Sequence, residues 1–459
     1  MYDQRMIKRS LLLLLVLLLA ACQPVGTRLP DATAMPTATP LPTATSVPPT
    51  PQPTPGVTAV PTETPAPTPT PGPDTSTFTD CALLPALPSC GGKLPLSGRL
   101  AFNDLANKRL VAVDFKTGAA WQVPLQAPAL AGPAGLSFSP SGKLLAAFPP
   151  GNSGQPYVIY ESTNGARVDQ AAPQGIDAWT PQDSFEGTPF RTVYSAAGDQ
   201  AMIDSDSSLA HVRFASSPDK DVTWPVVPGP NDRIPQAVSW VPGSDLLLFE
   251  LHYASNSMWI SGGALFTLNV KTGEVKDMKA AMLLNFKFQW HPTEPGVLVF
   301  GDSSNSPVMG GQQLAELNVL TGQLSHPISD PKVSVSAEGW LPDGKTILFA
   351  AIPGQTPAAG TTATTAANPF ALPAIYTINR DGSGLHAVTK PSQVQRDDQP
   401  QLLADGQHFL YYRSDTQGGT FSVHLAALDG SLDQAVTGAL TAPPCTVTCA
   451  WNAAVVYQP

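Results

Sequence analysis

The chain has 459 residues with a formal net charge of −10, from 25 Lys and Arg against 35 Asp and Glu, and only 13% of its residues are charged. An acidic balance with no basic run argues against a nucleic-acid partner. Its 50 prolines are densest between Gln23 and Thr77, so a folded body is expected only after that stretch.

The amino terminus has the pattern of an export signal. Lys8 and Arg9 precede the apolar run Leu11–Leu19, which leads into LAAC ending at Cys22. This run is too short to span a bilayer and is typical of a secretory signal. Small residues directly before a cysteine resemble the lipobox of bacterial lipoproteins. The resemblance implies removal of residues 1–21 and lipidation of Cys22, which would anchor the chain outside the cytoplasm to the cell membrane or the outer membrane. The alternative is an ordinary signal peptide with an incidental cysteine.

Residues 22–78 form the next predicted region. Apart from the cysteine, this stretch is mostly Pro, Thr and Ala with few charges. Such a composition has too little apolar surface to offset the entropy of ordering and favours an extended polyproline II chain. At about 3.1 Å per residue it could reach on the order of 150 Å. We therefore predict a disordered stalk between the lipid and a body over residues 79–459.

The body contains four cysteines, an even number that suggests two disulfides in an exported protein. They are Cys81, Cys90, Cys445 and Cys449. The last two are four residues apart in a predicted strand, roughly 13 Å if extended, which is too far for a direct bridge. Cross-pairing between the two ends of the body is therefore favoured. The alternative is a local Cys81–Cys90 loop, with a turn joining the other two.

A β-hairpin pattern recurs about every 50 residues through the body. Its clearest copy is EGWLPDGKTILFAA at Glu338–Ala351, in which Pro342 and Asp343 suit the corners of a tight turn and Gly344 suits a residue with positive φ. The aligned positions of the seven copies are Phe138, Tyr194, Trp240, Trp290, Trp340, Leu402 and Trp451. We expect the aromatic residues among them to pack in the core. A second turn follows or precedes each copy, as in Lys271-Thr272-Gly273.

Two hairpins per repeat predict four-stranded antiparallel units that are apolar on both faces. Such units bury both faces only by stacking around a closed ring. The predicted fold is therefore an all-β, seven-bladed β-propeller of four-stranded antiparallel blades. Because the body begins mid-repeat and ends with Thr446–Val456, one blade should contain strands from both ends of the chain.

Two segments support a family resemblance. WLPDGKTILFA and IYTINRDGSGLHAVT, which ends at Thr389, are similar to the repeats of the TolB-type, WD40-like (PD40) propellers. The resemblance implies a propeller fold and an extracytoplasmic setting. TolB proteins carry an α/β domain before the propeller, and no such domain is expected in this chain, so the resemblance does not imply their Tol–Pal role.

The expected binding surface lies on the longer connections between strands, because long loops of varied sequence carry function on a rigid scaffold. Aromatic and charged residues in or next to these loops would suit a protein or glycan partner. They are Trp179, Asp183, Phe185, Glu186, Arg233, Tyr253, Trp259, Arg396 and Arg413. The alternative for each is a role as a loop anchor.

Known catalytic and metal-binding patterns are missing from the sequence. It has no G-x-S-x-G or H-E-x-x-H, and its histidines are scattered. Segments 204–207 and 302–305 vaguely resemble calcium loops but lack the required Gly and Glu. No catalytic residue, metal or cofactor is therefore predicted. A glycosidase would need converging carboxylates. The candidates are Asp177, Asp183, Glu186, Glu250 and Glu338.

These patterns favour a membrane-anchored extracytoplasmic lipoprotein whose propeller is a non-catalytic binding module for a protein or polysaccharide. A carbohydrate-active or other hydrolytic propeller, and a structural component of the cell envelope, are the alternatives. The sequence leaves the identity of the partner and the oligomeric state open.

Overall fold

The structure is a computed structural model. It describes residues 76–125, 135–147, 158–168, 176–183, 185–188, 192–204, 207–226, 233–253, 263–282, 288–304, 312–328, 333–353, 373–415, 419–441 and 455–459. Within these ranges the chain is all-β, and the short 3-10 helix η1 (Pro88–Cys90) is its helical element. None of the described helices is long and apolar enough to cross a membrane.

The sheet that contains the clearest repeat is a four-stranded antiparallel meander. Its strands are β23 (Val333–Trp340), β24 (Thr346–Pro353), β25 (Ala374–Asn379) and β26 (His386–Ala387). In the turn between β23 and β24, Gly344 has φ of +62° and its N–H donates to the Leu341 carbonyl at 2.9 Å. The Asp343 carboxylate accepts the N–H groups of Lys345 and Thr346. The turn predicted from the sequence is therefore confirmed, and it fixes the register of the two strands.

Three other sheets have the same meander. One contains β5 (Leu136–Phe138), β6 (Leu144–Ala147), β7 (Val158–Glu161) and β8 (Arg167–Val168). The second contains β11 (Thr192–Tyr194), β12 (Gln200–Asp204), β13 (Leu209–Arg213) and β14 (Asp221–Pro225). The third contains β27 (Gln395–Leu402), β28 (His408–Asp415), β29 (Thr420–Ala427), β30 (Asp433–Ala435) and the short β31 (Leu440–Thr441).

Two further meanders are joined into one eight-stranded sheet. The first is β15 (Arg233–Trp240), β16 (Leu246–Tyr253), β17 (Gly263–Asn269) and β18 (Val275–Met282). The second is β19 (Gln289–Trp290), β20 (Val297–Asp302), β21 (Gln313–Asn318) and β22 (Gln323–Ile328). One register pair, Met282 with Asp302, connects them. A separate hairpin of β9 (Ile176–Trp179) and β10 (Phe185–Thr188) precedes β11.

The remaining sheet, called here the closing sheet, combines segments from far apart in the chain. It contains β1 (Ser76–Thr77), β2 (Arg99–Asp104), β3 (Arg109–Asp114), β4 (Ala119–Pro124) and β32 (Val455–Gln458), in the order β1-β4-β3-β2-β32. The register runs from Arg99 with Gln458 to Phe102 with Val455. One strand from the end of the chain thus completes a sheet built from the start of the described body.

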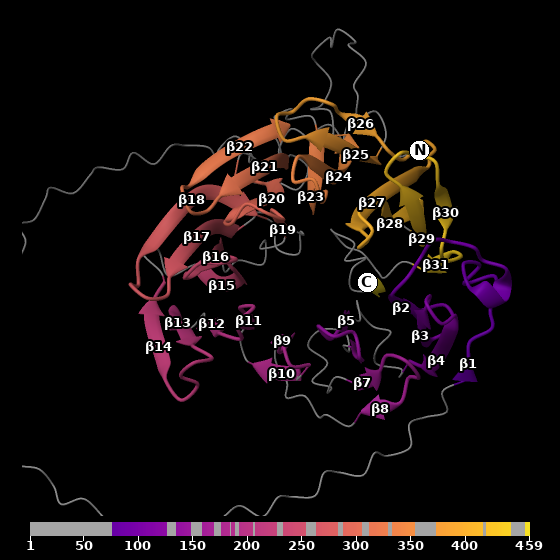
Figure 1. Ribbon diagram of the computed structural model, residues 1–459, viewed down its shortest axis with the longest axis horizontal. Helices are drawn as coiled ribbons and strands as arrows, with labels where there is room; N and C mark the ends of the chain where they lie inside the picture. Colours follow the sequence, from indigo (N-terminus) through magenta and orange to yellow (C-terminus); the bar gives the residue numbers. More distant parts are fainter. Residues whose placement is uncertain are drawn as a thin grey trace, which may run out of the picture. The chain divides into compact units, whose positions relative to one another are not determined.

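Apolar cores lie between neighbouring meanders, with the closing sheet counted as one of them. Each core contains buried residues from both neighbours, for example Leu110 and Leu145, Val212 and Phe249, Leu248 and Phe300, Val299 and Phe349, Ile375 and Phe409, and Leu425 and Leu100. Figure 1 shows the sheets following one another around a ring, with the yellow β27–β31 beside the indigo β2–β4. The body is therefore a β-propeller. The count of seven blades stays a prediction, because two meanders share one sheet and a two-stranded hairpin stands between two others.

Tryptophans at the repeat position pack between sheets. Trp340 is 2% exposed and Trp240 is 7% exposed, so the prediction of core packing is confirmed for both. The indole N–H of Trp240 donates to the Val193 carbonyl, and that of Trp290 donates to Ser239 Oγ, each in the preceding meander. These bonds satisfy polar groups that would otherwise be costly to bury. Trp451 lies outside the described residues.

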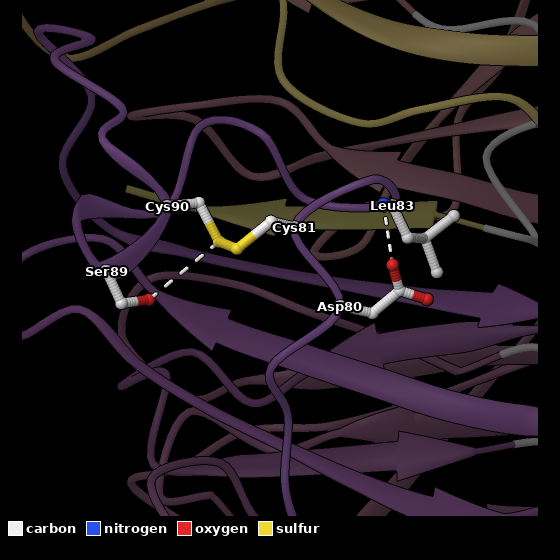
Figure 2. The surroundings of a disulfide bond; sticks show 5 residues. All are labelled: Asp80, Cys81, Leu83, Ser89 and Cys90. Carbon is white, nitrogen blue, oxygen red and sulfur yellow. Dashed lines mark hydrogen bonds between the residues drawn. A yellow bond between two sulfur atoms is a disulfide. The ribbon is translucent and has the colours of Figure 1, made fainter.

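The favoured disulfide pairing is wrong for the two cysteines that the structure describes. Cys81 and Cys90 are bonded to each other, with their Cα atoms 5.4 Å apart (Figure 2). The chain between them folds back through η1, and the Gly92 N–H donates to the Leu87 carbonyl at 2.9 Å. This fold-back brings the cysteines into bridging range without a partner from the far end of the chain. Cys445 and Cys449 lie outside the described residues.

Candidate functional site

The predicted binding residues divide between the two ends of the sheets. We call the end with the turns between first and second strands the short-turn end, and the opposite end the long-loop end. Arg233 begins β15 and pairs in register with Tyr253 at the end of β16. This pair lies at the long-loop end, because the turn that joins β15 to β16 is at their other ends. The side chains of both residues, and all of Trp259, lie outside the described residues.

The β9–β10 hairpin places its tip at the short-turn end. Asp183, in its turn, accepts hydrogen bonds from the N–H and Oγ of Ser141, which lies in the turn between β5 and β6. Gln182 Nε2 lies 3.9 Å from the position that a Cβ would take on Gly198, in the turn between β11 and β12. Trp179 and Phe185 pair in register next to this tip. The predicted residues on this hairpin are Trp179, Asp183, Phe185 and Glu186. The tip of the hairpin is therefore at the opposite end of the sheets from Arg233 and Tyr253.

Asp183 acts as an anchor between the hairpin and the neighbouring sheet. Its φ is +62°, a conformation that Asp tolerates better than most residues. The hydrogen bonds from Ser141 stabilise the carboxylate and lower its pKa. The anchor role that was the alternative for each residue is therefore observed here, and a binding role for Asp183 stays a prediction.

Arg413 and Arg396 both lie near the long-loop end of the β27–β30 sheet and both bind carboxylates. Arg413 donates to both oxygens of Asp397 at 2.8 Å and to Asp433 at 3.0 Å. Burial opposes the charge of Arg413, but these bonds raise its pKa overall. Arg396 donates to Asp398. Both cations therefore contribute to the ordering of this end of the sheet.

The same sheet holds a chain of polar side chains that sequence reasoning missed. Ser422 Oγ lies 3.1 Å from His424 Nε2, and His424 Nδ1 lies 3.1 Å from Asp433 Oδ1. Tyr411 donates its hydroxyl to Asp433 Oδ1 at 2.6 Å. The imidazole side chain is 12% exposed and the Asp433 side chain 34%. Burial opposes the ionisation of Asp433, but the hydrogen bonds from His424, Tyr411 and Arg413 hold its pKa well below the ordinary value.

The sequence could have indicated that Ser422 and His424 lie close together, since residues i and i+2 of a strand share a face. Asp433 could not be joined to them from the sequence, because that requires the registers of β28, β29 and β30. In those registers His424 pairs with Tyr411 on one side and with Ala435 on the other.

Acidic side chains also recur where second strands end, at the long-loop end. These residues are Asp104, Asp204, Asp302 and Asp415. Asp302 accepts the Ala281 N–H at 3.1 Å and His326 Nε2 at 2.8 Å. Asp204 accepts the Ser207 N–H, and Asp415 accepts the N–H groups of Gly419 and Thr420. Asp104, Asp204 and Asp302 bind the start of the connection that follows them, and Asp415 binds the end of its connection. Among the described residues, no group of three or more His, Cys, Asp or Glu could hold a metal ion.

The candidate carboxylates of a glycosidase are spread over three parts of the fold. Asp177, Asp183 and Glu186 belong to the β9–β10 hairpin, Glu250 to β16 and Glu338 to β23. Glu250 is 1% exposed and its backbone pairs with Gln236. The side chains of Asp177, Glu186 and Glu338 lie outside the described residues, so their role stays a prediction.

Comparisons with known proteins add structural similarities at low identity. No protein-family model matches the chain, and no curated protein does. TolB from Agrobacterium tumefaciens is similar with a TM-score of 0.34 at 14% identity, over 59% of this chain and 92% of that one. A prolyl endopeptidase has a TM-score of 0.45 at 11% identity, over 75% of this chain and 50% of that one. An oligogalacturonate lyase in complex with manganese has a TM-score of 0.39 at 11% identity, over 74% and 85%. Two of these structures are named as enzymes, and no activity or partner transfers to this chain.

Proposed function

We propose that this chain is a lipid-anchored extracytoplasmic propeller that binds a protein or polysaccharide through the long-loop end of its sheets. The observation that carries this proposal is the recurring carboxylate at the ends of second strands. Asp104 and Asp302 bind the starts, and Asp415 the end, of connections that differ in length and sequence. A frame that recurs under varied loops supports a binding surface at this end.

Two observations support the extracytoplasmic setting. The Cys81–Cys90 disulfide is of a kind that persists in oxidising compartments. The sequence begins with the pattern of an export signal, and Cys22 is in the position of a lipidated cysteine. Two or three acyl chains would hold the protein on a membrane, at about 0.8 kcal/mol per buried CH₂. Replacement of Cys22 by Ser should move the protein from the membrane fraction to the medium or periplasm. Continued membrane association and lipid labelling of that variant would refute the anchor.

Cross-linking in intact cells, read by mass spectrometry, tests the binding proposal. Replacement of residues 254–262, at the long-loop end, by a Gly/Ser linker of equal length should abolish the cross-links to a specific partner. The matched control is a Gly/Ser exchange at Lys271-Thr272, in the turn between β17 and β18 at the other end of the same sheet, and it should leave the cross-links in place. Equal loss in both variants, or no specific partner in the unaltered protein, would contradict binding at this end. The second outcome would favour a structural envelope component.

A further inference from the structure

Ser422, His424 and Asp433 form a continuous hydrogen-bonded chain in the β27–β30 sheet. The two distances along it are 3.1 Å from Ser422 Oγ to His424 Nε2 and 3.1 Å from His424 Nδ1 to Asp433 Oδ1. The order of the atoms matters for chemistry. The histidine faces the carboxylate through Nδ1 and the hydroxyl through Nε2, which is the arrangement in which a histidine activates a serine.

The protonation pattern follows from Asp433. Hydrogen bonds from Tyr411 and Arg413 keep its carboxylate ionised, so it accepts rather than donates. His424 therefore donates Nδ1–H to Asp433 and presents the lone pair of Nε2 to the Ser422 hydroxyl. In this tautomer Nε2 can take the serine proton, and the adjacent carboxylate stabilises the imidazolium that results.

Rigid neighbours hold the chain in place. Ser422 and His424 lie two residues apart on β29, so their side chains share one face of the sheet. The Tyr411 ring packs against the His424 ring with centroids 5.3 Å apart. Asp433 is bound by groups from two strands, His424 on β29 and Tyr411 and Arg413 on β28. A site built on strands with supported side chains is preorganised.

The position of Ser422 makes it reachable from the proposed binding end. It is half-buried and is the third residue of β29, which begins at the long-loop end. Arg413, whose guanidinium is bound by Asp397 and Asp433, pairs with Ser422 in register on β28.

We propose that Ser422 is a nucleophile for acyl transfer from carboxylic esters. Ser422 Oγ bonds to the ester carbonyl carbon while its proton passes to His424 Nε2. The imidazolium then protonates the departing alkoxide, so an alcohol leaves and an acyl-serine remains. Water attacks this acyl group, again with His424 as the base, and releases the carboxylic acid and the free serine. Asp433 is a positioning residue.

This inference goes beyond the proposed binding function and is opposed to the expectation of a non-catalytic protein. The two proposals fail separately. Loss of the 254–262 loop should remove partner cross-links and leave the serine reactive, whereas replacement of Ser422 should do the reverse.

Labelling of the full chain with a fluorophosphonate ester, read by intact mass and peptide mapping, tests the nucleophile. One label should appear on Ser422. The Ser422→Ala variant should lose it, and His424→Gln should label at least about 10²-fold more slowly, the usual contribution of a positioned base. Asp433→Asn should also label more slowly at a temperature well below its own melting point, where the variant is fully folded, which separates positioning from folding. The matched control Ser431→Ala, in the turn before β30, should label like the unaltered protein.

Absence of a label on Ser422 in the folded, unaltered protein would overturn the proposal. An equal labelling rate in His424→Gln would overturn it as well, since the histidine would then not activate the serine. The result on the unaltered protein stands even where a variant does not fold. Hydrolysis of p-nitrophenyl acetate, with the same dependence on Ser422 and His424, is the expected companion result.

Discussion

Two seams of the ring are built differently. The closing seam, between the β27–β30 sheet and the closing sheet, has a large apolar core that also includes Leu84 and Leu87 from the segment before β2. The hairpin seam, between β5–β8 and β11–β14, contains the β9–β10 hairpin. Its described cluster has Ala146 and Ile159 as buried members, with Trp179 packed against them. Asp183 and Ser141 make a polar contact in this seam.

The segment 78–97 explains the difference. It crosses the junction where β2, near the start of the described body, meets β32 at its end, and the Gly438 N–H of the last repeat donates to the Leu83 carbonyl at 2.8 Å. Arg109 of β3 holds the same segment through Asp80 at 2.9 Å and lies over the Phe78 ring. A ring closed without a covalent link between its ends depends on this junction. We infer that the segment acts as a strap over the closing seam, and that the hairpin seam opens more easily.

Replacement of Leu87 by Ala in the strap should give the largest loss of stability. Leu87 is 1% exposed in the closing core, so the change removes buried methyl groups and leaves a cavity, at a cost of about 2–5 kcal/mol. Chemical denaturation followed by tryptophan fluorescence measures the loss. Leu320→Ala is the control, because Leu320 is 46% exposed and should change stability by less than about 0.5 kcal/mol. Equal midpoints for the two variants would refute the strap.

Removal of the disulfide should have a smaller effect on the same seam. The Cys81→Ser, Cys90→Ser double variant opens a loop with a sequence separation of 9, and loop-closure entropy predicts a loss of about 2–3 kcal/mol. The unaltered protein under reducing conditions provides the comparison. An unchanged denaturation midpoint would show that the apolar contacts of the strap suffice without the covalent bond.

The Asp80–Arg109 pair should make the closing seam sensitive to acid. The hydrogen bond from Arg109 lowers the pKa of Asp80 in the folded protein. A lowered pKa gives stability that is present above the unfolded value, about 3.9, and is lost as pH falls through the folded value. Asp80→Asn should therefore cost up to about 1 kcal/mol at pH 7, as for other partly exposed pairs. The difference should vanish towards pH 2 in denaturation curves measured across this range, and a constant difference would contradict the ion pair.

Much of the fold could be predicted from the sequence, because its determinants are local. The turn at Gly344 and the alternation within each meander need only neighbouring residues. The pairing of Cys81 was mispredicted because the fold-back between Leu87 and Gly92 depends on backbone hydrogen bonds that spacing does not reveal. The site was predicted less well. The contact of Asp183 with Ser141 and that of His424 with Asp433 join separate strands or turns, and only three-dimensional registers bring them together.

Replacement of Asp183, the anchor in the hairpin seam, should have the smallest effect on the global stability of the protein, because its effect is confined to the hairpin. Asp183→Ala removes the acceptors for the N–H and Oγ of Ser141, which are worth about 0.5–1.5 kcal/mol each. Amide hydrogen exchange in 176–183 and 185–188 should accelerate by about fivefold to 10²-fold for the two bonds together, while the global midpoint stays constant, since local opening is independent of the core. Asp183→Asn, which tolerates positive φ and keeps one acceptor, should lie between. A fall in the global midpoint as large as that of Leu87→Ala would show instead that both seams unfold as one unit.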